Sequence, residues 1–146
     1  VRLRGSYVIE CTGYKTDEDG NIVEVLAEYD PETQGGAARE GERVRGTIHW
    51  LDEETAVKAE VRLYDNLFTV ENPDSSEYDY HELLNPNSLT VIENAYVEPW
   101  LKHDRSHIGY QFMRTGYFIH DCHDTTDEKL VFNRSVALRD SYNPDK

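Results

Sequence analysis

Residues that build covalent or metal-bound sites are scarce in this chain of 146 amino acids. Its two cysteines, Cys11 and Cys122, lie far apart and outside any metal-binding spacing. They are therefore either reduced, as is usual in the cytosol, or joined in one bridge. The sequence has no apolar run long enough to span a membrane and no signal-peptide pattern, which predicts a cytoplasmic protein without a membrane partner.

Catalytic signatures are missing as well. The chain contains no Gly-rich phosphate loop, no HExxH and no GxSxG motif. A His-Asp-Cys-His-Asp run at residues 120–124 offers zinc-binding side chains, but no second pair of ligands occurs at a suitable spacing, and a polar turn accounts for it. We therefore predict no catalytic residue, no metal site and no bound cofactor within this chain.

Basic residues are also few, because 15 Lys and Arg stand against 29 Asp and Glu, for a formal net charge of −14. This balance argues against nucleic-acid binding, since phosphate contacts need a positive surface. RNA binding depends on the local electrostatic potential rather than on the net charge, however. The arginines lie in strand-like segments, whereas the acids gather in turns. The sequence thus allows either a basic face opposite an acidic back or a charge that serves only solubility. The acidic clusters are Asp17–Asp19, Asp52–Glu54, Asp74–Asp79 and Asp124–Glu128.

Short segments of alternating polarity, separated by turns, dominate the sequence. Two of them flank a turn at Asp17–Asn21 and predict a hairpin of residues 6–15 and 22–29. The one predicted helix, residues 76–84, follows a serine N-cap. Many short strands with one short helix predict an all-β fold of the barrel or sandwich type. Further strands are expected at residues 43–50, 58–64, 89–96, 110–120 and 130–139.

Aromatic residues concentrate in the stretch Tyr110–Phe118, which the pattern predicts as a single strand. Alternation places Arg114 on one face with Tyr110 and Phe112, and Gln111 on the other face. The Gln111 amide and the Arg114 guanidinium carry the donors and the acceptor needed to read an unpaired base, on which a nearby aromatic ring can stack. The alternative is an arginine that is stacked or ion-paired for structural reasons.

Two arginines, Arg2 and Arg4, share one face of the strand predicted at the start of the chain. Two neighbouring guanidinium groups suit a base with adjacent acceptors, such as cytosine, or a phosphate. An exposed strand face with acidic partners across the sheet is the alternative, and it applies equally to Arg43 and Arg45, which repeat the pattern. Four large aromatic residues are expected in the core: Trp50, Trp100, Phe68 and Phe132.

Six segments in order resemble those of one known family. They are Val1–Arg4 (VRLR), Arg45–Trp50 (RGTIHW), Val61–Phe68 (VRLYDNLF), Asn85–Leu89 (NPNSL), Gln111–Phe118 (QFMRTGYF) and Val131–Asp140 (VFNRSVALRD). Together they are similar, nearly from end to end, to the C-terminal anticodon-binding region of the glutaminyl-tRNA synthetases, which are class I aminoacyl-tRNA synthetases. The absence of an initial Met agrees with a fragment of such a protein.

The resemblance implies two small β-barrels like those of ribosomal protein L25. Residues 1–70 would form a complete distal barrel, and residues 71–146 the returning half of a proximal barrel. The outgoing half, and the catalytic domain that uses ATP and Mg²⁺, would lie upstream. The chain is thus expected to be a non-catalytic fragment of a monomeric, cytoplasmic, ATP-dependent ligase.

By the same resemblance, Arg2 and Arg4 contact the first anticodon base of tRNA(Gln), while Gln111 and Arg114 contact the middle base, a uracil. The pairing edge of uracil presents an acceptor beside a donor, which one amide side chain matches, and splayed bases expose such edges. Met113 departs from the family pattern, where an acid is expected, and this leaves the local charge open.

Three other functions stay open on the sequence alone. One is the corresponding domain of an archaeal- or eukaryotic-type glutamyl-tRNA synthetase, whose C-terminal barrels are similar. Another is an L25-like barrel that binds ribosomal RNA. The third is a protein-interaction domain, which the acidic net charge favours.

Overall fold

The computed structural model describes residues 1–37, 39–41, 43–75, 77–104, 106 and 109–138, and it divides the chain into two compact units, Val1–Trp50 and Leu51–Lys146. Strands dominate both units, and the helical segments among the described residues are short 3-10 turns, so the predicted all-β class is confirmed. The first unit ends after Trp50, and residues 57–64 form a strand of the second unit's sheet. Within the described residues, no helix is both long and apolar enough to cross a membrane.

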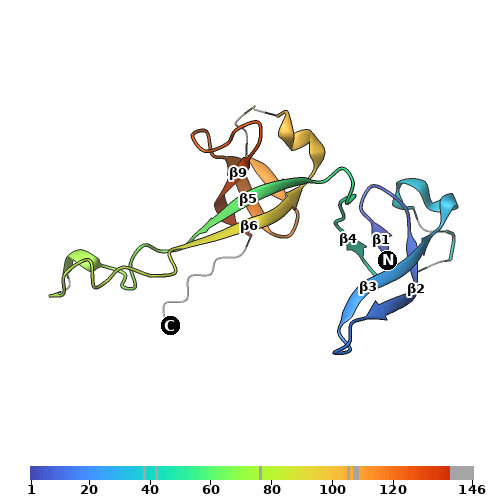
Figure 1. The fold of residues 1–146 in the computed structure, drawn as a ribbon, viewed down its shortest axis with the longest axis horizontal. Coiled ribbons are helices and arrows are strands. Elements are labelled where there is room, and N and C mark those ends of the chain that lie inside the picture. Colours follow the sequence, from blue (N-terminus) through green and yellow to red (C-terminus); the bar gives the residue numbers. More distant parts are fainter. Residues whose placement is uncertain (38, 42, 76, 105, 107–108, 139–146) are drawn as a thin grey trace. The chain divides into compact units, whose positions relative to one another are not determined.

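The first unit contains the predicted hairpin, formed by β2 (Ile9–Thr16) and β3 (Ile22–Tyr29) in antiparallel register (Figure 1). Asp17 closes its turn, since the Asp17 carboxylate accepts the backbone N–H groups of Asp19 and Asn21 at 3.0 and 2.8 Å. The side-chain amide of Asn21 and these backbone donors hold the pKa of Asp17 below its usual value. The turn is therefore encoded locally, by a side chain that substitutes for backbone partners.

A second, shorter sheet of this unit pairs β1 (Arg2–Leu3) in parallel with β4 (Thr47–Ile48). The strand expected at residues 43–50 is thus reduced to two residues. Gly46 precedes β4 with a φ of 132°, a backbone conformation that glycine adopts readily and other residues avoid. The long loop between the hairpin and β4 contains a 3-10 segment, η1 (Pro31–Gly36).

The core of the first unit is small and includes a polar side chain. Val8 and Thr33 are buried, and the Thr33 hydroxyl donates to the Asp30 carbonyl at 2.7 Å and accepts the Val8 N–H at 2.9 Å. A buried hydroxyl that makes both hydrogen bonds avoids the penalty of an unpaired polar group. This contact ties η1 to the start of the hairpin and so fixes the loop that carries Gly36.

The second unit contains one five-stranded sheet in the order β6-β5-β9-β8-β7. All neighbouring strands are antiparallel except β5 and β9, which run parallel. Figure 1 shows β5 and β6 as one long twisted pair, with β9 beside β5. The sequence pattern places β5, β6 and the start of β9 correctly. The strand bounds are β5 (Val57–Tyr64), β6 (Leu89–Val97), β7 (Tyr110–Phe112), β8 (Gly116–His120) and β9 (Leu130–Ala137).

Aromatic rings from the last three strands form the centre of this unit. Phe118 and Phe132 have no exposed surface. The Phe112 ring stacks on Phe118 with centroids 4.4 Å apart, and Phe132 meets Phe112 edge-on at 5.2 Å. Such pairs add about 0.5–1.5 kcal/mol beyond the area that they bury. The β7–β8 hairpin is therefore held against a rigid aromatic base.

The expectation that four large aromatic residues lie in the core is only partly right. Phe132 is buried and Phe68 is half-buried, whereas Trp50 and Trp100 are 42% and 54% exposed. The Trp50 indole N–H donates to the Arg4 carbonyl at 3.2 Å, which ties it to the surface of the first unit. An indole ring has a polar N–H donor as well as apolar surface, so Trp suits a partly solvent-exposed position better than Phe does.

The helix expected at residues 76–84 is wrong, because all described residues of this range form turns or bends or are irregular, apart from one isolated bridge at its end. Asp79 interrupts the segment, since its carboxylate accepts the backbone N–H of His81 at 2.8 Å. The next hydrogen bond, from Glu82 to the Asp79 carbonyl, spans three residues rather than four. The chain that remains is too short to offset the cost of starting an α-helix.

Candidate functional site

Arg2 lies on β1 of the short parallel sheet, and Arg4 lies in the turn that directly follows this strand rather than on it. The Arg2 N–H donates to the Gly46 carbonyl at 2.9 Å, and the Arg4 N–H donates to the Ile48 carbonyl at 3.0 Å. The backbone thus places both arginines beside a segment from the far end of the unit. Neither guanidinium makes an ion pair or hydrogen bond with a described residue, so the alternative of acidic partners across the sheet is not observed there.

The side chain of Arg2 packs on Gly36. A Cβ at Gly36 would lie 2.8 Å from Cδ and 3.1 Å from Cγ of Arg2, closer than side chains tolerate. Burial by this contact leaves the Arg2 Nε without solvent and without a hydrogen-bond partner among the described residues. A buried unpaired donor costs about 1–3 kcal/mol, so the packing of the aliphatic stem holds the guanidinium in place at a cost to stability.

Replacing Gly36 with Ala is expected to displace the Arg2 side chain, because the new methyl group occupies the space of the Arg2 stem. The matched control is Gly35→Ala, since Gly35 has nearly the same left-handed φ (81° against 82°) but open space at its Cβ. Both variants carry the backbone strain of about 1–2 kcal/mol. Only Gly36→Ala should shift the NMR signal of the Arg2 Nε–H group and lose further stability in urea. Equal effects in the two variants would contradict the packing role.

Gln111 and Arg114 lie on one hairpin rather than on one strand. The predicted strand at 110–120 is interrupted after Phe112, where the Thr115 N–H donates to the Phe112 carbonyl at 2.9 Å and closes a tight turn. Gln111 is exposed on β7, and Arg114 is exposed at the tip of the turn. The expected alternation of faces through Arg114 is therefore wrong, and the turn places both side chains at the same end of the β7–β8 hairpin.

Two neighbouring residues give this turn its shape. Arg114 has a φ of 62° and is the one non-glycine residue with positive φ in the described part of the chain. This left-handed conformation costs about 1–2 kcal/mol for a residue with a side chain, and such strain is often found at functional positions. At Gly116, a Cβ would lie 2.7 Å from the Val136 carbonyl, so only glycine lets β8 approach β9 here.

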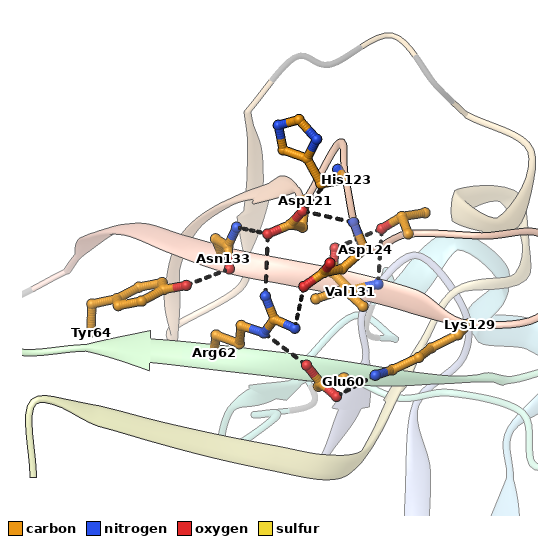
Figure 2. Close-up of polar contacts among 10 residues, drawn as sticks. Glu60, Arg62, Tyr64, Asp121, His123, Asp124, Lys129, Val131 and Asn133 are labelled. Carbon is orange, nitrogen blue, oxygen red and sulfur yellow. Dashed lines mark hydrogen bonds and ion pairs between the residues drawn. The ribbon is translucent and has the colours of Figure 1, made fainter.

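A cluster of charged residues on the same sheet is centred on Arg62 (Figure 2). The Arg62 guanidinium contacts Glu60 at 2.7 Å, Asp121 at 3.3 Å and Asp124 at 2.6 Å. Lys129 adds a second cation at 2.7 Å from Glu60. The side chains of Arg62, Glu60 and Asp121 are only 19%, 13% and 15% exposed, so these ion pairs are shielded from water. All three sides of the Arg62 fork are thus occupied by acids, which points to a structural role.

The Arg62 cluster also sets the protonation of its acids. The Asn133 side chain, the backbone N–H groups of Asp124 and His123, and the Arg62 charge lower the pKa of Asp121 to about 2. The hydrogen bonds that Arg62 donates to the Asp124 and Glu60 carboxylates raise the pKa of Arg62 above its usual value. Asp121 and Arg62 therefore keep their charges at neutral pH, and their contacts fix the loop after β8.

The His-Asp-Cys-His-Asp run does not come together as a metal site. His120 is buried among aromatic rings, with its centroid 4.4 Å from that of Phe132, whereas Cys122 and His123 are exposed. In the described ranges, no three His, Cys, Asp or Glu side chains gather as ligands. Both cysteines, Cys11 and Cys122, are free thiols on the surface.

The structure brings the predicted residues together in two pairs, one in each unit. Arg2 and Arg4 form the first pair, and Gln111 and Arg114 the second. The sequence did not reveal that Gly36 supports Arg2, since two adjacent glycines in a loop are common and carry no signal of a packing role.

A comparison with protein families supplies the identity of the fold. A model described as "tRNA synthetases class I (E and Q), anti-codon binding domain" matches residues 47–121. The chain belongs to this family. The matched range includes Gln111 and Arg114 of the second unit, while Arg2 and Arg4 lie outside it.

Individual relatives of this family are similar over almost the whole chain. Glutamine–tRNA ligases of Vibrio vulnificus, Vibrio cholerae and Aliivibrio fischeri are 49%, 48% and 47% identical to it over 142 residues, which is 97% of the chain. The chain spans 25% of the length of each of these relatives.

Proposed function

We propose that this chain is the anticodon-binding region of a glutamine–tRNA ligase and that it binds the anticodon loop of tRNA(Gln). The observation that carries the proposal is the family match at residues 47–121, which contains the exposed Gln111 on β7 and the exposed Arg114 in the turn after it. The near 50% identity to glutamine–tRNA ligases favours glutamine over glutamate, the other amino acid in the family description.

Each pair of residues suits an unpaired base. Gln111 offers an amide with one acceptor and two donors, and Arg114 adds a planar set of donors, which together match the pairing edge of a middle uracil. Arg2 and Arg4 offer two guanidinium groups to the acceptors of the first base. The acidic net charge of the chain opposes RNA binding in general, so the proposed affinity depends on these local contacts.

The same proposal extends to the architecture. We infer that the first unit corresponds to the distal anticodon-binding barrel and the second unit to the returning half of the proximal one. In support, β6 and β7 are the end strands of the described sheet, where a further segment of a longer protein can pair. The use of ATP and Mg²⁺ to activate glutamine belongs, on this proposal, to a separate catalytic domain.

Binding of labelled anticodon stem–loops tests the proposal when each protein variant is measured against stem–loops that differ at one anticodon base. Gln111→Ala is expected to remove the preference for uracil over cytosine at the middle base, a loss of about 1–3 kcal/mol, without changing the response to the first base. Arg4→Ala is expected to do the reverse. If neither variant couples to an anticodon base, the proposed function is wrong.

Competition experiments separate the remaining candidates. A chain that prefers a glutamate-accepting tRNA would belong to a glutamyl-tRNA synthetase, which the family description allows. If a double-helical ribosomal RNA fragment competes for the chain and anticodon stem–loops do not, the chain would instead resemble L25 in function. The absence of any RNA binding at low salt would favour a protein-interaction domain.

A further inference from the structure

The basic side chains of the first unit fall into two groups with different surroundings. Lys15 pairs with Glu24 at 2.7 Å, and Arg39 pairs with Asp30 at 2.7 Å and with Glu32 at 3.2 Å. The other four have no ion pair or side-chain hydrogen bond with any residue that the structure describes. They are Arg2, Arg4, Arg43 and Arg45.

The four unpaired arginines come from two segments that the tertiary structure joins. The parallel pairing of β1 with β4, together with the bond from the Arg2 N–H to the Gly46 carbonyl, sets residues 1–4 beside residues 45–48. Neither residues 1–9 nor residues 43–50 contain an acid, although the unit as a whole has more acids than bases. We call Arg2, Arg4 and Arg45, together with Arg43 two residues before Arg45 in the chain, the arginine edge.

An edge of this kind matches a phosphate backbone. Each guanidinium offers paired donors to phosphate oxygens, and four such groups without an ion pair to any described acid favour a local positive potential on an otherwise acidic chain. Arg43 and Arg45 are both exposed, so their donors face solvent. In contrast, the Arg39 guanidinium is already neutralised by two carboxylates and has little to offer an anion.

We propose that Arg43 and Arg45 bind the phosphates of the RNA strand next to the base held by Arg2 and Arg4. This inference rests on the proposed function, and it assigns Arg43 and Arg45 a role that does not depend on the identity of the base. The arginine edge then has two parts, one that selects the base and one that holds the backbone in register with it.

The salt dependence of stem–loop binding tests this assignment. Arg43→Ala and Arg45→Ala are each expected to make the plot of log K against log salt concentration shallower by about 0.7, the value for one phosphate contact on a single strand. The preference for the correct first base should stay unchanged in both variants. Arg39→Ala is the control, because it removes the same charge from the same unit but should leave the slope as it is.

Each outcome bears on one of the two proposals. Slopes for Arg43→Ala and Arg45→Ala that equal those of the unaltered chain or of Arg39→Ala would overturn the phosphate role, while base coupling at Arg4 would keep the proposed function intact. A change in base preference in either variant would also overturn it, since a backbone contact is blind to sequence. If the unaltered chain shows no base-dependent binding, the proposed function fails, and the placement of Arg43 and Arg45 beside a selected base fails with it.

Discussion

Replacing Asp121 with Ala is expected to lower the free energy of unfolding of the second unit by about 3 kcal/mol. Asp121 accepts hydrogen bonds from the Asn133 side chain at 2.8 Å and from two backbone N–H groups of its own loop at 2.9 Å, and it contacts Arg62 at 3.3 Å (Figure 2). Its removal leaves the half-buried Arg62 and Asn133 with fewer partners, which costs more than a surface ion pair. Urea unfolding followed by Trp100 fluorescence, in a Trp50→Phe background, measures the loss.

A control from the same loop separates this effect from a simple change of charge. Glu128→Ala removes one exposed carboxylate and should change stability by less than about 0.5 kcal/mol. Asp121→Asn, which keeps one acceptor oxygen, should fall between the two. If Asp121→Ala proved no more destabilising than Glu128→Ala, the Arg62 cluster would be a surface feature with little effect on the fold.

The same carboxylate makes stability depend on pH in a defined direction. The pKa of Asp121 is about 2 in the folded chain, below its ordinary value of 3.8. A depressed pKa contributes stability that is complete above about pH 5 and is mostly lost as the pH falls to 2, here about 2 kcal/mol. The difference in stability between the unaltered chain and Asp121→Asn should therefore shrink by this amount between pH 5 and pH 2.

Replacing Arg114 with Gly or with Ala is expected to separate its role in folding from its role in binding. Both variants remove the guanidinium, so both should weaken binding of the anticodon stem–loop by about 1–3 kcal/mol, roughly 5- to 150-fold. Their stabilities should differ, because only glycine adopts the φ of 62° without strain. Arg114→Gly is expected to be more stable than Arg114→Ala by about 1 kcal/mol.

The Gly–Ala comparison at Arg114 cancels every contact that the arginine side chain makes, since both variants lack it. Stem–loop titration gives the affinities, and urea unfolding gives the stabilities. A glycine variant that binds RNA like the unaltered chain would rule out a base contact by Arg114. Equal stability of the two variants would mean that the turn relaxes and stores no strain.

Much of the fold follows from local sequence patterns. The β2–β3 hairpin was predicted from alternation around Asp17, and the structure confirms it because the Asp17 carboxylate closes the turn without help from distant residues. β5 and β6 were found in the same way. The failures have different causes. The β7–β8 turn needs the close approach of Gly116 to the Val136 carbonyl, a long-range contact that no local pattern records. The helix expected at residues 76–84 is interrupted locally, by the hydrogen bond from the His81 N–H to the Asp79 carboxylate.

The candidate site also has features that the sequence predicts and features that only the folded structure shows. The order of short motifs in the sequence was enough to place the chain in its family and to single out Arg2, Arg4, Gln111 and Arg114. The hydrogen-bonding groups of a side chain follow from the type of residue alone, so they can be read from the sequence. Tertiary structure alone decided what surrounds them. It packed Arg2 on Gly36, and it joined Arg45 to the edge that holds Arg4. Contacts between residues far apart in the chain depend on backbone pairing and on excluded volume, and neither is visible until the chain is folded.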